Sequence, residues 1–323
     1  MILTITINPL LERKLYFNNV KYGKENRAFK EELAAGGKGI NVSRQLNYLG
    51  IKNSAFTFIG GNNGKIFRSI LAHEKIDYSS VSTKSETRSA DLIMDLNEEK
   101  ITTFFGVNSS ITKDESDDFK NKLGKMIQNC SAVVFSGSSP CKETDDIFPY
   151  GIELANKHDK ISVLDTYGEH LSRCIGSSPT VIHNNVHEIE TSLGIPVSSE
   201  TDKIKFLEHL YSRGIKMAFL TDGSNPSYTS KYDFHYKVYP PEINAMDATG
   251  SGDSFVAGII YGLENALVYD EFIRIATALG AANATTWDEC RVTTNQMNVY
   301  FDKVKVEPLG KRMKLIDDSP TVH

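Results

Sequence analysis

The segment DATGSGDSF, residues 247–255, places small residues around two glycines immediately before an apolar run. Gly250, Ser251 and Gly252 leave their backbone N–H groups unobstructed, and the run that follows is expected to form a helix. Amides at the N-terminal end of a helix attract anions, and phosphate is a common occupant. A carboxylate beside phosphate is unfavourable unless it accepts a proton from an attacking hydroxyl, which is the role expected for Asp253. The alternative is a glycine-rich turn with Asp253 in the first helical turn.

A second glycine motif, GGKGIN, occupies residues 36–41. Consecutive glycines before a helix allow the backbone to approach a ligand closely, and Lys38 and Asn41 add a cation and an amide at the helix start. Taken alone, the motif fits a glycine turn with a solvated lysine equally well. Its pairing with the glycine–aspartate motif near the other end of the chain favours ligand binding.

The segment HNNVHEIE carries Asn185 and Glu188 three residues apart, directly after an expected strand. At a helix start this spacing presents an amide and a carboxylate to the same side. Carboxylate oxygens are preferred by Mg²⁺, whose shell is usually completed by waters and substrate phosphates. A helix cap with a surface glutamate is the alternative for this pair.

Short β-branched runs alternate with helical patterns almost throughout the chain. This alternation predicts an α/β fold in which a mostly parallel sheet is sandwiched by helices. Expected strands lie at residues 2–8, 54–60, 132–137, 161–166, 180–184 and 217–223, and expected helices at 39–50, 115–128, 146–156, 186–193, 201–212 and from 254 onwards.

Two regions, residues 14–34 and 77–105, alternate like exposed strands with no helix between them. We expect both to form one small β-sheet lid that closes over a ligand or pairs with another subunit, which allows a homodimer through the lid. Residues 1–310 are then a single domain, and the polar residues 311–323 a flexible tail.

The bulk properties exclude several classes of protein. The 323 residues are 40% hydrophobic and 24% charged, with a net charge of −5 and no basic stripe to bind nucleic acid. No apolar stretch approaches the ~18 residues that a membrane span needs. The four cysteines form no CxxC pair, which is typical of a reduced, cytoplasmic protein.

The motifs GGKGIN at 36, SGSSP at 136, LDTYGE at 164, NNVHE at 184 and DATGSGDSFVAG at 247 occur together and in order. With them the chain resembles the ribokinase-like sugar kinases, and within these the PfkB branch that holds 1-phosphofructokinase and tagatose-6-phosphate kinase. The start of the chain and Asn26–Arg27 are similar to that branch rather than to nucleoside kinases. The resemblance extends over residues 1 to 305.

The resemblance implies a catalytic base at Asp253 and an anion hole at Gly250, Ser251 and Gly252. It also implies that ATP and Mg²⁺ are the cofactors and a sugar phosphate the substrate. The implied substrate-binding residues are Glu12, Arg27, Gly37, Lys38, Asn41, Arg88 and Ser138. The implied nucleotide-binding residues are Asn185, Thr221, Asp222, Gly223, Gly250, Gly252 and Asn283, with Asn283 beside the purine. Asn185 and Glu188 are the implied metal-site residues.

Some positions depart from the family pattern. The usual N-P-A-x-D is NPLLE, so Glu12 replaces an aspartate that grips sugar hydroxyls, and its extra methylene displaces the carboxylate. The usual KPN is HNN at 183–185, and the usual SLG is TDG at 221–223. These departures affect substrate identity, whereas the intact Asp253 motif predicts phosphoryl transfer.

The resulting hypothesis is ATP-dependent phosphorylation of a ketohexose phosphate, with fructose 1-phosphate the first candidate and tagatose 6-phosphate the alternative. Lys38, Arg27 and Arg88 favour a phosphorylated substrate, because a neutral sugar gives three cations no partner. Two further alternatives are a kinase of an unphosphorylated sugar or nucleoside, and a non-catalytic regulator that binds ATP or sugar phosphate.

Overall fold

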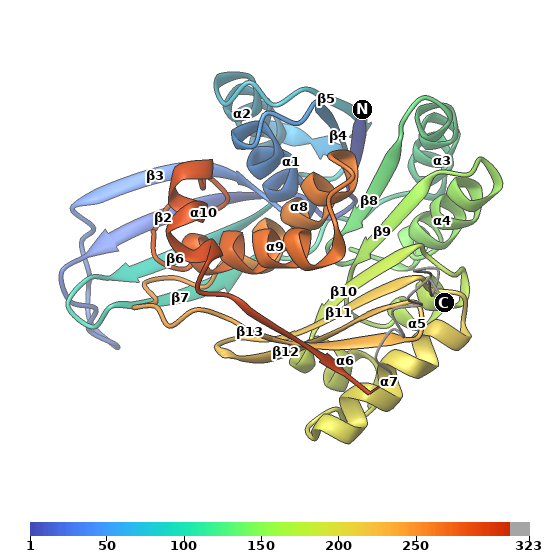
Figure 1. Ribbon diagram of the computed structural model, residues 1–323. Helices are drawn as coiled ribbons and strands as arrows, with labels where there is room; N and C mark the ends of the chain where they lie inside the picture. Colours follow the sequence, from blue (N-terminus) through green and yellow to red (C-terminus); the bar gives the residue numbers. More distant parts are fainter. Residues whose placement is uncertain (311–323) are drawn as a thin grey trace, which may run out of the picture.

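A ten-stranded sheet forms the centre of the computed structural model, which describes residues 1–310 (Figure 1). From edge to edge its strands are β14 (Lys305–Leu309), β13 (Phe234–Tyr239), β12 (Asn225–Lys231), β11 (Met217–Asp222), β10 (Val181–Asn185), β9 (Ile161–Asp165), β8 (Ala132–Ser136), β1 (Ile2–Thr6), β4 (Asn53–Gly60) and β5 (Tyr78–Thr83). Neighbours from β11 to β5 pair in parallel, whereas β12, β13 and β14 add an antiparallel edge. The predicted tail at 311–323 lies outside the described residues.

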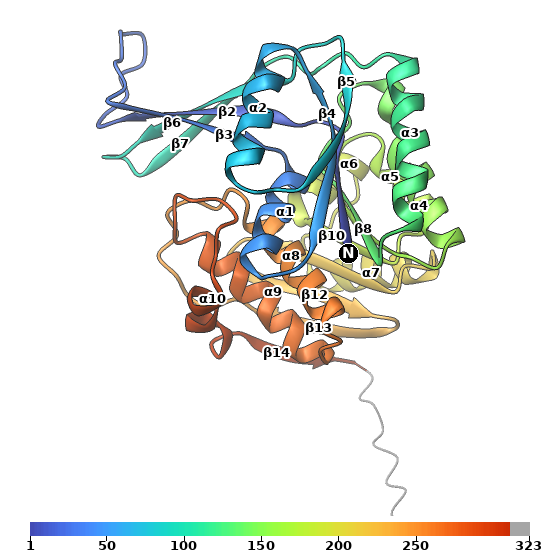
Figure 2. The same ribbon diagram turned by 90° about the horizontal axis from the view of Figure 1, so that it is seen from above.

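Helices cover both faces of this sheet (Figures 1 and 2). Their bounds are α1 (Lys38–Tyr48), α2 (Gly61–His73), α3 (Lys113–Gln128), α4 (Ile147–Lys157), α5 (Leu171–Gly176), α6 (Val186–Leu193), α7 (Glu200–Ser212), α8 (Ser251–Glu264), α9 (Tyr269–Asn283) and α10 (Thr294–Phe301), with one 3₁₀ turn, η1 (Lys142–Thr144). Helices α3 to α7 contribute to one hydrophobic cluster, and α1, α8, α9 and α10 to a second. The predicted fold class, a mostly parallel sheet sandwiched by helices, is confirmed.

Two features of the main body were not expected from the sequence. Helix α2 begins with the polar, glycine-containing run Gly61–Asn62–Asn63–Gly64, which lacks a helix-forming signal, and it is held by burial of Phe67 and Leu71. The antiparallel strands β12 to β14 carry many tyrosines and lysines and show no strong two-residue period. Tertiary packing overrides weak local preference in both cases.

A separate four-stranded sheet, here called the small sheet, projects from the main body (Figure 2). Its strand order is β3 (Lys30–Gly36), β2 (Leu10–Phe17), β6 (Arg88–Asp95) and β7 (Lys100–Phe105). The predicted lid ranges of 14–34 and 77–105 need correction, because the small sheet begins at Leu10. Residues 78–83 form β5, which pairs in parallel with β4 at the edge of the large sheet. An edge strand is half-exposed, so its alternation resembles that of a projecting strand.

The register of the small sheet decides which of its side chains are buried. Leu10, Glu12, Lys14 and Tyr16 alternate along β2 and therefore share one face, here called the inner face. Leu10 and Tyr16 pack with Trp287 of the main body, so this face is covered. The same alternation buries the two charged side chains of Glu12 and Lys14.

No helix within residues 1–310 has the length and apolar character needed to cross a membrane. All four cysteines carry free thiols, so no disulfide constrains the chain. Cys130, Cys174 and Cys290 are buried, and Cys141 is half-buried.

Candidate active site

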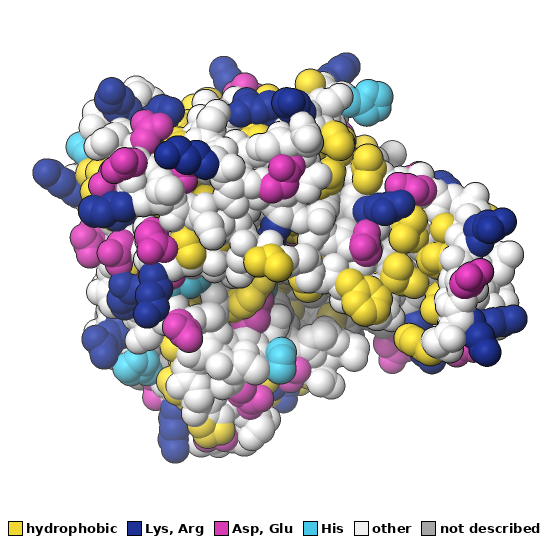
Figure 3. All heavy atoms as spheres, turned by 180° about the vertical axis from the view of Figure 1, so that it is seen from behind, with side chains coloured by type: hydrophobic (Ala, Val, Ile, Leu, Met, Phe, Trp, Pro, Cys, Tyr) yellow, Lys and Arg dark blue, Asp and Glu magenta, His cyan; other side chains and the backbone are white. Residues whose placement is uncertain are grey.

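The polar residues of the predicted site gather at one edge of the large sheet. β9 ends at Asp165, β10 at Asn185 and β11 at Asp222, and these strands run in parallel. Parallel strands present their carboxyl ends at the same edge, where α/β proteins bind ligands. The N-terminal ends of α1 and α8 are joined to each other by a hydrogen bond between Asn41 and Asp253, and Lys38 of α1 contacts Asp165 at this edge. Figure 3 shows the molecule hollowed between the main body and the projecting small sheet.

Asp253 lies in the first turn of α8 and is only 5% exposed. Its Oδ2 accepts a hydrogen bond of 2.8 Å from Asn41 Nδ2. Burial raises the pKa of Asp253 to about 7, with Lys38 opposing the rise and Asp165 adding to it. A carboxyl group with a pKa near neutrality is well matched to accepting a proton at physiological pH.

The glycine turn before α8 has the conformation expected of an anion site. Gly250 caps the helix with a left-handed φ of 75°, which favours glycine. The Ser251 amide donates to the Ala248 carbonyl at 3.1 Å, so this predicted donor closes a turn. Gly252 and Asp253 occupy the first helical turn, where backbone N–H groups have no intrahelical acceptor. Their amides are therefore the ones oriented toward an anion.

Asn283 supports this turn. Its Nδ2 donates to Thr249 O at 2.7 Å and to Ser251 Oγ at 3.2 Å, while its Oδ1 accepts from Ser254 Oγ and Cys290 N. These four bonds use the full capacity of an amide, and Asn283 is 1% exposed. The polar atoms of the Asn283 side chain are therefore all bonded within the protein, and its position beside a purine stays a prediction.

Lys38 lies between two carboxylates. Its ammonium group contacts Asp165 Oδ1 at 3.2 Å and Glu188 Oε1 at 2.7 Å, and it lies over the Tyr167 ring. Burial opposes ionisation of Asp165, but Lys38 and His183 outweigh it and hold the pKa of Asp165 down at about 2. Lys38 thus forms an ion pair with Glu188, a predicted metal-site residue. The predicted contact of Lys38 with the sugar phosphate stays a prediction.

Asn185 and Glu188 form a capping box at the start of α6. Asn185 Oδ1 accepts from the Glu188 amide at 2.8 Å, and Glu188 Oε2 accepts from the Asn185 amide at 3.0 Å. The helix-cap alternative is therefore present in the structure. The glutamate is not on the surface, however: its side chain is 12% exposed and its other oxygen binds Lys38.

The oxygen atoms near Glu188 suit a hard cation. Asp165 Oδ2 and Asn184 Oδ1 are buried without a hydrogen-bond partner among the described residues. Within residues 1–310, no three or more His, Cys, Asp or Glu side chains are grouped to hold a metal by themselves. Mg²⁺ often binds through one or two carboxylates and takes its remaining ligands from water and substrate phosphates, so these residues fit it.

Arg88 lies at the base of the small sheet beside the strand ends. It donates to Asn8 O and to Asn108 Oδ1, both at 3.2 Å, and its guanidinium lies over the Phe105 ring. Asn8 Nδ2 in turn donates to Asn108 and, at 3.0 Å, to the predicted residue Ser138. Arg88 Nε and Asn8 Oδ1 are both buried without a partner among the described residues. A donor and an acceptor are thus left for a ligand.

Glu12 is buried on the inner face of the small sheet. Burial raises the pKa of Glu12 to about 8, the nearby Glu289 adds to the rise, and Lys14 opposes it. Lys14 and Glu289 form a buried ion pair of 2.9 Å between the small sheet and the segment after α9. A Cβ on Gly36 would overlap Glu12 Oε1, so the carboxyl group lies directly against this glycine.

Two other predicted substrate-binding residues differ in their surroundings. Gly37 precedes α1 with a φ of 114°, and a Cβ there would lie 2.8 Å from Thr6 Cγ2, so a side chain is excluded on both grounds. Arg27 is exposed on the segment joining β2 to β3. It has no hydrogen bond or ion pair within residues 1–310, and its substrate role stays a prediction.

The predicted nucleotide segment after β11 has two anchored side chains. Thr221 Oγ1 lies 3.2 Å from His183 Nε2, and Asp222 pairs with the buried Lys203 at 2.8 Å. Gly223 is exposed in the turn to β12 and has a left-handed φ of 57°. The exposed backbone at Gly223 is accessible to a nucleotide, whereas the charge of Asp222 is neutralised by Lys203.

Several residues of the site were missed by sequence reasoning. Asp165 could have been found, since it is an aspartate at the carboxyl end of an expected strand. Glu289, Arg44 and Glu74 carry no such signal, because their partners are remote in sequence: Glu289 pairs with Lys14 275 residues away, and Arg44 with Glu74 30 residues away.

The mostly parallel sheet, the glycine turn before α8 and the buried Asp253 together define a class, the α/β kinases that transfer a phosphoryl group to a hydroxyl. Residues 6–289 match the pfkB family carbohydrate kinase. The chain belongs to this family, and the predictions of a carbohydrate kinase and of a ribokinase-like fold are confirmed.

Relatives in this family agree with that assignment. Over 309 residues the chain is 29% identical to a tagatose-6-phosphate kinase of Staphylococcus epidermidis, covering 95% of this chain and 99% of the relative. Over 295 residues it is 30% identical to a 1-phosphofructokinase of Borreliella burgdorferi, covering 90% and 94%.

Solved structures show the same fold. A possible 1-phosphofructokinase from Thermotoga maritima superposes with a TM-score of 0.88 at 22% identity, covering 96% of this chain and 99% of that one. A putative phosphofructokinase from Staphylococcus aureus gives a TM-score of 0.80 at 25% identity, covering 97% and 100%.

Replacing Lys38 with methionine should destabilise the protein in a pH-dependent way. Asp165, whose pKa is held at about 2, stabilises the fold above its ordinary value of 3.8, and this contribution is lost as pH falls toward 2. Without Lys38 the buried carboxylates lose a partner, so the free energy of unfolding at pH 7 should fall by roughly 3–5 kcal/mol. The loss should stay nearly constant from pH 7 to about 4 and shrink as pH falls from about 4 toward 2, which urea unfolding at several pH values measures.

Lys122→Met removes an exposed lysine paired with Asp118 and serves as the control, with an expected change below about 1 kcal/mol. A Lys38→Met loss that does not vary with pH would contradict the electrostatic role of Lys38.

Proposed function

We propose that this kinase phosphorylates a ketohexose phosphate with ATP, and that its substrate is fructose 1-phosphate, which becomes fructose 1,6-bisphosphate. The observation that carries the proposal is the buried carboxyl group of Asp253, with a pKa of about 7, in the first turn of the glycine-capped helix α8. A base and an anion-binding amide cluster at one helix start are the two parts that phosphoryl transfer to a hydroxyl requires.

In the proposed reaction, Asp253 accepts the proton of the sugar hydroxyl as its oxygen attacks the γ-phosphorus of ATP. The bond from that phosphorus to the bridging oxygen breaks, and ADP leaves with the electron pair. The amides of Gly252 and Asp253 face the negative charge on the transferring group. Asn41 holds one oxygen of Asp253, which leaves the other oxygen for the substrate.

Asp165 and Glu188 are the residues proposed to hold Mg²⁺ through its water shell, with Asn185 fixing the Glu188 carboxylate through the capping box. When bound, the ion neutralises charge on the ATP phosphates. We assign ATP to the strand ends near Gly223, where the backbone is exposed. Consumption of ATP and a sugar phosphate implies a cytoplasmic enzyme.

The substrate phosphate is assigned to Arg88 because this side chain is a cation whose Nε donor lacks a partner among the described residues, whereas the neighbouring Asn8 Oδ1 is an acceptor that suits a sugar hydroxyl. Arg27, on the segment joining β2 to β3 of the small sheet, is the second proposed cation. Tagatose 6-phosphate remains the alternative substrate, since relatives of both names match at similar identity. An unphosphorylated sugar or a nucleoside has no phosphate to pair with the charge of Arg88. A non-catalytic regulator does not need a carboxyl group whose pKa is near neutrality at Asp253.

We also propose a homodimer formed through the small sheet. Hydrophobic side chains gather on this projecting sheet (Figure 3). Phe104 is 57% exposed and lies opposite Asp91, on the face turned away from the inner face, and Leu33 of β3 is 44% exposed. Exposed apolar residues on a projecting sheet are typical of an interaction surface.

Asp253→Asn should abolish turnover while leaving ATP affinity nearly unchanged. The amide keeps the shape of the side chain but cannot accept the hydroxyl proton, so a loss of ~10²–10⁴-fold in kcat is expected. In the wild type, kcat should rise with pH through about 7, because only the ionised Asp253 acts as a base. An ADP-release assay and nucleotide titration measure both, and a variant with more than half of wild-type kcat would remove Asp253 from the mechanism.

Arg88→Ala should raise KM for the sugar phosphate at least tenfold, while KM for ATP changes little. The charge-assisted hydrogen bonds that it removes contribute about 1.5–3 kcal/mol. Its preference for fructose 1-phosphate over fructose should shrink as well. Arg68→Ala, on α2, is a control with no expected effect on either KM. A wild type that prefers the free sugar would replace the proposed substrate class.

Phe104→Asp should convert the proposed dimer to a monomer, because it replaces an exposed aromatic side chain of the proposed interface with a charge and places it opposite Asp91. Sedimentation velocity across a concentration series measures the state. Tyr211→Asp makes a matched change at an exposed aromatic of α7 and should leave the dimer intact. A wild type that stays monomeric at all concentrations would rule out the dimer.

A further inference from the structure

A buried arginine lies directly behind the proposed catalytic base. Arg44, on α1, is 4% exposed, and its guanidinium group meets three acceptors. Its NH1 donates to Asn41 Oδ1 at 2.6 Å, its NH2 to Ala35 O at 2.6 Å and its Nε to Glu74 Oε2 at 2.9 Å. The guanidinium group presents its donors from three nitrogen atoms in fixed directions, whereas an ammonium group presents all its donors from one atom and cannot reach three acceptors spaced in this way.

These bonds determine which way the Asn41 amide faces. Arg44 can only donate, so the Asn41 oxygen must point toward it. The Asn41 NH₂ group must then point the opposite way, where Nδ2 donates to Asp253 Oδ2 at 2.8 Å. Reversing the amide would place two donors face to face at Arg44 and two oxygens face to face at Asp253. The second Nδ2 proton remains free for a substrate.

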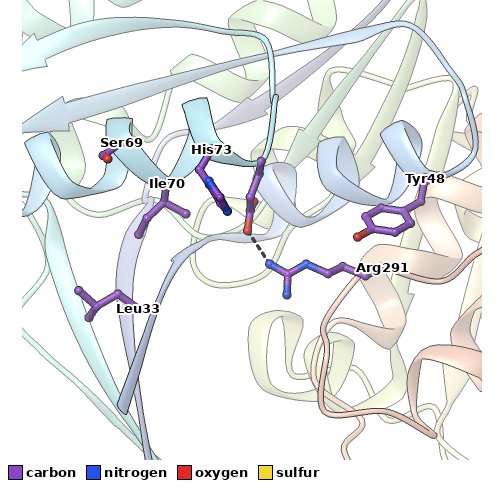
Figure 4. Close-up of a pocket in the computed structure, with 7 residues that line it drawn as sticks. Leu33, Tyr48, Ser69, Ile70, His73 and Arg291 are labelled. Carbon is purple, nitrogen blue, oxygen red and sulfur yellow. Dashed lines mark hydrogen bonds and ion pairs between the residues drawn. The ribbon is translucent and has the colours of Figure 1, made fainter. Parts of the chain in front are cut away.

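The outer end of this chain of bonds reaches the surface. Glu74, which follows α2, accepts from Arg44 with one oxygen and pairs with Arg291 through the other at 2.5 Å. Arg291 lines a cavity of about 750 Å³ together with Tyr48 and His73, and Figure 4 shows its guanidinium group joined to its partner by a dashed line. The series Arg291–Glu74–Arg44–Asn41–Asp253 therefore connects three segments of the main body to the base.

We propose that Arg44, held in place by Glu74, is a positioning residue for phosphoryl transfer: it fixes the Asn41 amide, which in turn fixes the Asp253 carboxylate toward the sugar hydroxyl. This inference rests on the proposed function and extends it to residues that do not touch the substrate. A buried ion pair often adds little stability over apolar packing of similar volume, so the buried guanidinium favours a role for Arg44 beyond packing.

Charge alone does not explain the arrangement. The titratable groups around Asp253, from every element packed against it, are Glu12, Lys38, Asp165, His183, Glu289 and Cys290. The charge of Arg44 lowers the pKa of Glu12 and of Cys290. Its link to Asp253 runs through the Asn41 hydrogen bond, which lowers the pKa of that carboxyl group. Geometry and charge are therefore separable by substitution.

Arg44→Lys tests this, because it keeps the charge and removes the fork. With the full-length kinase and fructose 1-phosphate, kcat should fall by about tenfold or more, while KM for sugar and ATP changes less than about threefold. The acid limb of the kcat–pH profile should move to higher pH, since Asp253 loses a hydrogen bond to its ionised form. Glu74→Gln should lower kcat and shift the acid limb in the same directions, but by less. Arg173→Lys, at an exposed ion pair, should change neither kcat nor the pH profile.

A second measurement needs no turnover. The pKa of Asp253, read by ¹³C NMR of labelled carboxyl groups and assigned with Asp253→Asn, should be higher in Arg44→Lys and Glu74→Gln than in the wild type. Unchanged kcat, pH profile and NMR pKa in folded variants would overturn the positioning role. A rise in KM with unchanged kcat would overturn it too and would assign Asn41 to substrate binding. A wild type that is inactive on every sugar phosphate would reject the proposed function alone. The NMR comparison would still test whether Arg44 and Glu74 act on Asp253 through Asn41.

Discussion

The buried ammonium group of Lys38 makes it possible for several carboxylates to share the edge of the large sheet. Parallel strands and the start of α8 force Asp165, Glu188 and Asp253 into one region, where like charges repel and water is scarce. Lys38 contacts the first two directly and acts on the third through its charge. Lys38 lowers the pKa of both Asp165 and Asp253, but the outcomes differ. At Asp253 burial outweighs the cation and raises the pKa to about 7, whereas at Asp165 the direct contact with Lys38 and the His183 hydrogen bond outweigh burial and hold the pKa at about 2. Two carboxyl groups whose pKa values are pushed apart can take different roles.

The small sheet completes this site. Its inner face carries Glu12 and Lys14, and the ion pair of Lys14 with Glu289 joins it to the segment that also contains Cys290. The Cys290 thiol donates to the carbonyl of Gly250, so the same segment contacts both the small sheet and the anion-binding turn. The small sheet and the turn are therefore connected through a few residues of this segment. This connection depends on a buried ion pair, which is costly to break once formed.

Much of this structure could be predicted from local sequence, and the rest could not for physical reasons. The helix at 186–193 has the predicted bounds, because an asparagine cap and a glycine stop flank it. The β5 strand was misplaced because a half-exposed edge strand has the same alternation as a projecting one. The glycines of the Asp253 motif indicate an anion site from the sequence alone, whereas the hydrogen bonds of Asn283 to the glycine turn depend on the packing of α9 and have no local signal. Arg44 and Glu74 have ordinary helical contexts, and their role depends on the packing of α1 against α2, which no local pattern encodes.

Glu12 stands where the family pattern has an aspartate, and the protein around it accommodates the longer side chain. The longer side chain rests against Gly36, where any side chain would overlap it, so this glycine and the glutamate form a matched pair. The carboxyl group is also desolvated, which raises its pKa to about 8. Below that pH it is protonated and offers a hydrogen-bond donor as well as an acceptor, whereas an ionised aspartate offers acceptors alone. Glu12 can therefore face a sugar oxygen that has no proton to give, a ring or carbonyl oxygen among them. As a predicted substrate-binding residue, Glu12 would therefore differ from an aspartate in its hydrogen-bonding chemistry as well as in its reach.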